Sequence, residues 1–166
     1  MGLFSFLKNA GASIFKGKEA EVKAVETNSN SAEETAAKLK ALKESLLISS
    51  VTTMGLKVED LSVNMEDETV TVYGQVESQE DREKVILTLG NVEGVASVDD
   101  RLSVVTPAPE ASFYEVKKGD YLSKIAKEVY GDAMKYPVIF EANKPMLKDP
   151  DLIYPGQMLR IPPLDA

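Results

Sequence analysis

The spacing of apolar residues between positions 31 and 105 switches between the helix period and the strand period, which limits the folds open to this chain. Two segments, Ser31 to about Ser49 and Ser78 to Leu89, repeat apolar residues every three or four positions, as one face of a helix does. Three other segments alternate apolar with polar residues, which is the strand period, and they begin near Leu61, Val70 and Val95. The predicted order is therefore α-β-β-α-β, a three-stranded sheet with two helices on one face.

The last third of the chain has a pattern of its own beyond the stretch 106–112, which contains two prolines. Proline stiffens a linker, so we expect this stretch to join two separate domains. Three blocks follow at close spacing, at 113–126, 141–145 and 153–162. Together they resemble a LysM module, and this resemblance implies a β-α-α-β fold.

The earlier strands carry a second resemblance. The pattern Val70-x-Val72-x-Gly74-x-Val76, continued by residues 94–104, looks like a BON domain. We therefore expect an α+β protein of two small domains. The predicted divisions are an N-terminal amphipathic segment and linker at 1–30, a BON domain at 31–105, a linker at 106–112 and a LysM domain at 113–163.

Histidine and cysteine are both absent from the 166 residues, and the formal net charge is −8. Disulfides, thiol nucleophiles, Ser-His-Asp triads and the usual zinc sites are thereby excluded, so we expect no enzyme. The acidic excess lies in residues 1–112, because residues 113–166 hold eight basic and eight acidic residues. This charge disfavours nucleic acid and anionic lipid as partners.

The N-terminal segment lacks the features of a secretory signal. Its apolar run stops at Lys8 with no basic residue ahead of it, and no segment of the chain approaches the roughly 20 apolar residues of a membrane span. We therefore expect a cytoplasmic protein. Residues 3–10 are predicted to form a short helix that Gly11 ends. Its apolar face is predicted to pack on the following domain, with a membrane anchor as the alternative, and comprises Leu3, Phe6, Leu7 and Ala10.

The combination of these segments is similar to the bacterial cytoplasmic potassium-binding proteins, in which a BON domain precedes a LysM domain. The likeness extends to Lys8-x-Ala10-Gly11, to residues 90–100 and to residues 140–148. It implies selective binding of K⁺ over Na⁺, as a potassium sensor or buffer, and no enzymatic activity. An unidentified protein partner stays open.

Potassium is best held by several neutral oxygens, commonly backbone carbonyls that replace its hydration shell. Carboxylate clusters suit Ca²⁺ or Mg²⁺ better, and the acidic residues of this chain are scattered. The last carbonyls of a helix lack partners within it and lie at its negative end, so the two predicted helix ends supply candidate ligands. The predicted carbonyl ligands are Leu7, Ala10, Gly90, Val92 and Val95. The alternative is that Gly11 and Gly90 only end helices and that water satisfies these carbonyls.

In LysM modules, N-acetylglucosamine polymers lie between the first strand–helix loop and the second helix–strand loop. The corresponding positions here are Gly119, Asp120, Tyr121, Leu122, Asn143 and Ile153. Tyr121 stands where the family usually has threonine, and it could either stack on a sugar or block the groove. Met146 and Leu147 are predicted to contact the BON domain instead of a glycan. The alternative function is therefore peptidoglycan binding or interaction with the cell envelope.

Overall fold

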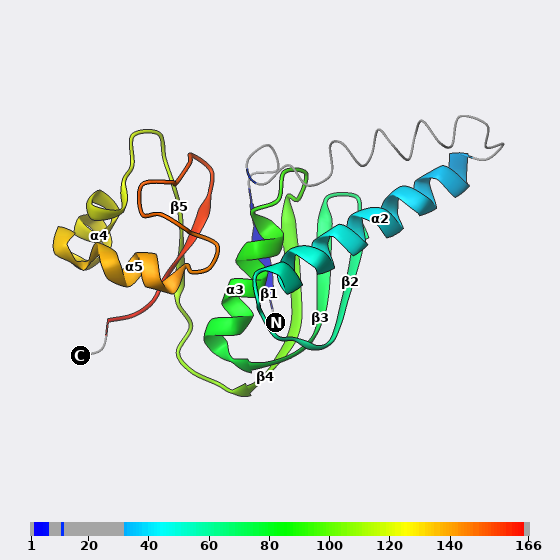
Figure 1. The fold of residues 1–166 in the computed structure, drawn as a ribbon, viewed down its shortest axis with the longest axis horizontal. Helices are drawn as coiled ribbons and strands as arrows, with labels where there is room; N and C mark the ends of the chain where they lie inside the picture. Colours follow the sequence, from blue (N-terminus) through cyan, green and yellow to red (C-terminus); the bar gives the residue numbers. More distant parts are fainter. Residues whose placement is uncertain (1, 7–10, 12–31, 165–166) are drawn as a thin grey trace.

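The structure, a computed structural model, describes residues 2–6, 11 and 32–164. These residues form two sheets with helices packed on them, so the predicted α+β class is confirmed (Figure 1). The first sheet has four strands in the order β1-β4-β3-β2, and the second has two strands, β5 and β6. Each sheet has its own hydrophobic core.

The first half follows the predicted order of elements after the N-terminal segment. Its elements are α2 (Ala32–Thr53), β2 (Glu59–Glu66), β3 (Thr69–Ser78), α3 (Gln79–Gly90) and β4 (Ser97–Thr106). The strands β2 and β3 form an antiparallel hairpin, whereas β3 and β4 are parallel and need the helical crossover that α3 provides. As predicted, Ser78 caps α3, since its hydroxyl accepts a hydrogen bond from the Asp81 amide at 3.1 Å.

Both helices contribute to one core with the sheet that they cover (Figure 1). On β3 the buried residues Val70, Val72 and Val76 alternate with more exposed ones, which is the pattern of a strand with one buried face. The largest fully buried side chains that the helices add to the same core are Leu47, Val51, Ile86, Leu87 and Leu89. The core therefore joins α2 and α3 to the same face of the sheet.

The prediction of a helix beginning at residue 3 is wrong. Gly2–Ser5 forms a strand, β1, which pairs antiparallel with β4 and adds a fourth strand to the predicted three. Two turns of isolated helix are marginal in water, whereas the open edge of β4 offers a full set of backbone hydrogen bonds. Of the predicted packing face, Phe6 is buried in the first core, whereas Leu3 is 66% exposed and does not pack there. Residues 7–10 lie outside the described residues.

The second half has the predicted β-α-α-β order with one added turn of 3₁₀ helix. Its elements are β5 (Ser112–Glu115), α4 (Leu122–Tyr130), η2 (Ala133–Lys135), α5 (Tyr136–Ala142) and β6 (Met158–Ile161). β5 and β6 are antiparallel. Leu159 and Ile161 of β6 share a core with both helices, and the half-buried Tyr114 of β5 packs against it. Gly131 ends α4 with a φ of 77°, a left-handed conformation that suits glycine.

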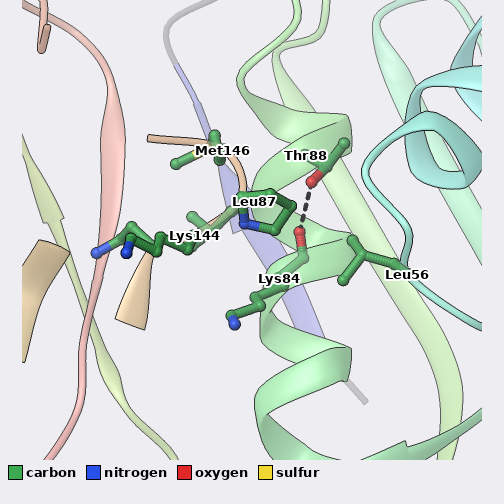
Figure 2. A pocket seen from close by; sticks show the side chains of 8 residues that line it. Leu56, Lys84, Leu87, Thr88, Lys144 and Met146 are labelled. Atoms are coloured by element: carbon green, nitrogen blue, oxygen red, sulfur yellow. Dashed lines mark hydrogen bonds between the residues drawn. The ribbon is translucent and has the colours of Figure 1, made fainter. Parts of the chain in front are cut away.

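The two halves pack against each other. Met146 contacts both cores, as predicted, whereas Leu147 belongs to the core of the second half. Phe4 of β1 lies with its ring centroid 5.3 Å from that of Phe113 of β5. Figure 2 shows Met146 beside the α3 residue Leu87 at this seam, whereas the Lys144 side chain extends away from α3. The space left beside Leu87 and Met146 is about 10 Å³, about that of one water molecule, so this part of the seam is closed.

Candidate functional site

The C-terminal end of α3 and the turn after it carry three of the predicted ligands. The helix ends at Gly90, and the amide of Asn91 donates to the Leu87 carbonyl at 2.9 Å. A tight turn follows, closed by a hydrogen bond of 3.1 Å from the Val95 amide to the Val92 carbonyl. Its third residue, Gly94, has a φ of 104°, which only glycine adopts without strain.

Two side chains of this turn are buried, and Glu93 between them is half-buried. Val92 and Val95 are almost completely buried in the first core. The carbonyl of Gly90 lies at the negative end of the α3 dipole, among the four carbonyls that have no partner within a helix. The Val92 carbonyl accepts from Val95, but a carbonyl oxygen has a second lone pair that can face a cation.

The N-terminal segment returns to this same turn. The amide of Phe6 donates to the Ala96 carbonyl at 2.8 Å, and the Phe6 ring lies against Gly90. At the other end of the segment, Gly11 packs so closely on the Asn91 carbonyl that an added Cβ would lie 2.2 Å from that oxygen. The predicted ligands Leu7 and Ala10 lie outside the described residues, between two residues that both contact the turn.

Carboxylates do not form a cage in the described part of the chain. No group of three or more acidic side chains gathers there in a way that could hold a metal ion. On β4, Asp100 is fully buried, accepts a hydrogen bond from the Arg82 guanidinium at 2.6 Å and accepts another from the Leu102 amide at 2.9 Å. Asp99 pairs with Arg101 at 3.1 Å on the surface. Apart from the single carboxylate of Glu93, the chemistry available at the turn is therefore that of neutral carbonyl oxygens.

One residue of this region was missed by the sequence interpretation. The Asn91 side-chain amide donates to the Met158 carbonyl at 2.8 Å and accepts from the Met158 amide at 2.9 Å. The turn is thereby joined to β6 of the second half. No local pattern marks this contact, because its two partners lie 67 positions apart in the sequence.

A pocket of about 250 Å³ lies beside Asn91, at the seam between the halves, and its wall includes Gly11, Ser50, Met54, Thr88, Asn91, Met146, Tyr154 and Gln157. Burial raises the pKa of the Tyr154 hydroxyl to about 12, so this group is neutral at physiological pH. The pocket therefore presents uncharged side chains next to the turn.

The predicted glycan residues are divided between an open pocket and the interior. Tyr121, which is 58% exposed, and Leu122 line a pocket of about 330 Å³ with Tyr136. In contrast, Asn143 is buried, with its amide bound to the backbone of Arg160 at 2.6 and 2.9 Å. Ile153 packs at the edge of the second core, and Gly119 takes a φ of 89° in the turn before α4.

Asp120, another of the predicted glycan residues, forms hydrogen bonds within the protein. Its carboxylate accepts from the Tyr114 hydroxyl at 2.7 Å and from the Lys117 amide at 3.0 Å. Burial alone would raise the pKa of Asp120, but these hydrogen bonds and the Lys124 ammonium outweigh it and lower that pKa. Burial and the hydrogen bond to Asp120 raise the pKa of Tyr114. Asp120 therefore stays ionised and holds the loop before α4.

Comparison with known proteins gives matches to both halves. A BON domain model matches residues 31–106, and a LysM domain model matches residues 114–162. A protein of Escherichia coli O6:H1 named potassium binding protein Kbp is 43% identical over 162 residues, which are 98% of this chain and 99% of that protein. An uncharacterised protein of Deinococcus radiodurans is 39% identical over 104 residues, which are 56% of this chain and 40% of that protein.

No helix between residues 32 and 164 has the length and apolar character that crossing a bilayer requires.

Proposed function

Because the chain belongs to the family of potassium binding protein Kbp, we propose that it binds K⁺ in preference to Na⁺ and serves as a cytoplasmic potassium sensor or buffer. We place the ion at the turn after α3, with the carbonyls of Gly90, Val92 and Val95 as ligands. The carbonyls of Leu7 and Ala10 complete the set. The protein acts by binding and catalyses no reaction.

The observation that carries this proposal is the return of the N-terminal segment to the turn. Phe6 and Gly11, the described residues on either side of Leu7 and Ala10 in the sequence, both contact residues 90–96. A large, weakly hydrated cation needs several neutral oxygens from more than one segment, and two backbone segments meeting at a helix C-terminus can provide them. The absence of a carboxylate cage among the described residues disfavours Ca²⁺ and Mg²⁺ as the ion.

Thermal unfolding in different chloride salts tests the proposal. A ligand that binds only the folded state raises its stability by about 2.7 kcal/mol when it is in hundredfold excess over Kd. We expect KCl to raise the melting temperature more than equal concentrations of NaCl or LiCl, and calorimetry to detect saturable K⁺ binding. Equal shifts in all three salts would reflect ionic strength alone and would refute selective K⁺ binding.

A second candidate function rests on the open pocket at Tyr121. Its exposed aromatic ring is suited to stacking on a sugar, so the LysM half is a candidate for binding N-acetylglucosamine polymers. Titration with chitin oligosaccharides, comparing the parent with Tyr121→Ala, separates the two functions. Saturable glycan binding that Tyr121→Ala removes would support this role, whereas no binding by the parent would leave the potassium function alone.

A further inference from the structure

The strand β6 has one edge that is not paired with β5, and two asparagine side chains bind it. On this edge the Asn143 amide accepts from the Arg160 amide at 2.6 Å and donates to the Arg160 carbonyl at 2.9 Å. Asn91 makes the same pair of bonds with Met158, at 2.9 and 2.8 Å. Since a carboxamide carries the donor and acceptor of a peptide group, these side chains replace the bonds that another strand would make.

The two asparagines differ in where they come from. Asn143 follows α5 of the same half, so its bonds hold the second half together. Asn91 follows α3 of the other half and is the residue between the proposed ligands Gly90 and Val92. It is 7% exposed, and its amide nitrogen also lies 3.4 Å from the sulfur of Met146. One side chain thus connects β6 with the turn proposed to hold the ion.

Holding this amide restricts the backbone around it. An asparagine side chain has only two rotatable bonds, so an amide fixed at both ends leaves its Cα little freedom. The peptide unit that joins Gly90 to Asn91 is planar and includes the Gly90 carbonyl. The next peptide unit joins Asn91 to Val92. Gly11 packs on the Asn91 carbonyl and so limits the rotation of this peptide unit. The directions of these carbonyls therefore depend on the hydrogen bonds of the Asn91 side chain.

We propose that Asn91 is a positioning residue for the potassium site, which aims the Gly90 carbonyl and the following turn by binding the free edge of β6. This inference rests on the proposed function. It assigns to the LysM half a part in ion selectivity, because the backbone of Met158 holds Asn91 in place. Selectivity between K⁺ and Na⁺ requires carbonyls at defined positions or of defined number, so a loosened turn should discriminate less well.

A second contact between the two halves provides a control variant, which weakens their packing without changing the turn. Glu83 lies on α3 about 10 Å before Gly90, at a rise of 1.5 Å per residue. Its carboxylate is buried, accepts from the Arg160 guanidinium at 2.7 Å and accepts from the Ala111 amide at 2.7 Å. The variant Glu83→Gln weakens docking but leaves the turn untouched.

The test compares K⁺ and Na⁺ binding by calorimetry in the full-length parent, Asn91→Ala, Asn91→Gln and Glu83→Gln. Loss of two hydrogen bonds predicts K⁺ affinity about tenfold weaker in Asn91→Ala, with a smaller ratio of K⁺ to Na⁺ affinity. Asn91→Gln keeps the amide but adds a rotatable bond. In this variant the two halves should still pack together, but the preference for K⁺ over Na⁺ should be lost. Glu83→Gln should melt earlier and keep the parental ratio. Parental selectivity in Asn91→Ala, or the same loss of selectivity in Glu83→Gln, would overturn the proposal.

A second measurement needs no ion and separates this inference from the proposed function. The amides of Val95 and Ala96 donate to the carbonyls of Val92 and Glu68, so their hydrogen exchange reports on the turn. In potassium-free buffer we expect faster exchange of both amides in Asn91→Ala and Asn91→Gln, and parental exchange in Glu83→Gln. Unchanged exchange in the Asn91 variants would overturn the positioning role even if the parent binds K⁺. A parent that fails to bind K⁺ would instead refute the proposed function.

Discussion

Gly90 is required by packing, whereas Gly94 is required by backbone conformation. Gly90 lies within the last turn of α3, where other residues fit the backbone, but a Cβ there would lie 2.1 Å from Cζ of Phe6. The sequence predicted that the helix ends at Gly90, and α3 does end there; the contact with Phe6 is a further reason for glycine at this position. Gly94 has a φ of 104°, so a side chain there would be strained whatever the surrounding space.

These two causes give different results in a double-mutant test. Gly90→Ala should lower the free energy of unfolding by about 1–3 kcal/mol, because the new methyl group overlaps the Phe6 ring. Combined with Phe6→Leu, it should lose less than the sum of the two single losses. Gly94→Ala should lose about 1–2 kcal/mol, with additive behaviour toward Phe6→Leu. Urea unfolding of the five variants measures this, and additivity at Gly90 would contradict the assigned contact.

At the level of elements, the periods of the sequence predicted every helix and strand between residues 31 and 106 in the right order. The β1 strand was not predicted, because Leu3, Phe6, Leu7 and Ala10 also fit one face of a helix and the segment is too short to decide. Its conformation depends on the open edge of β4, almost a hundred residues away. The bond between Asn91 and Met158 was missed for the same reason, since such a pairing leaves no local pattern.

The role of the N-terminal segment can be tested by removing residues 1–11. The variant should keep the helices and three remaining strands of the first half, because most of that core comes from α2, α3 and β2–β4. It should melt earlier, since burial of Phe6 is lost, and should respond equally to KCl and NaCl. Circular dichroism and melting in both salts measure these effects. Leu3→Ala is the control, because Leu3 is 66% exposed and should match the parent. A deletion variant that still prefers K⁺ would exclude Leu7 and Ala10 as ligands.

On the scale of the whole molecule, the two halves form one folded unit through a mixed seam. Its apolar part, around Met146, was predictable, because Met146 and Leu147 stood out in an otherwise polar loop. Its polar part was not predictable, since Glu83 and Arg160 are ordinary helix and strand residues in the sequence. In the structure they form an ion pair of 2.7 Å whose side chains are only 4% and 9% exposed. The Glu83 carboxylate also accepts from Gln79 at 3.2 Å and from the linker amide of Ala111.

Breaking this ion pair from one side should cost more than removing it altogether. Arg160→Met leaves the Glu83 carboxylate buried without its cation, which typically costs about 3–5 kcal/mol. The double variant Arg160→Met, Glu83→Gln removes both charges but keeps an acceptor for Ala111, so it should recover much of that loss. Chemical unfolding at neutral pH, repeated at high salt, measures both variants. The salt dependence should be small, because a buried pair is weakly screened. A double variant no more stable than Arg160→Met would show that the unpaired Glu83 carboxylate is not the cause of the loss.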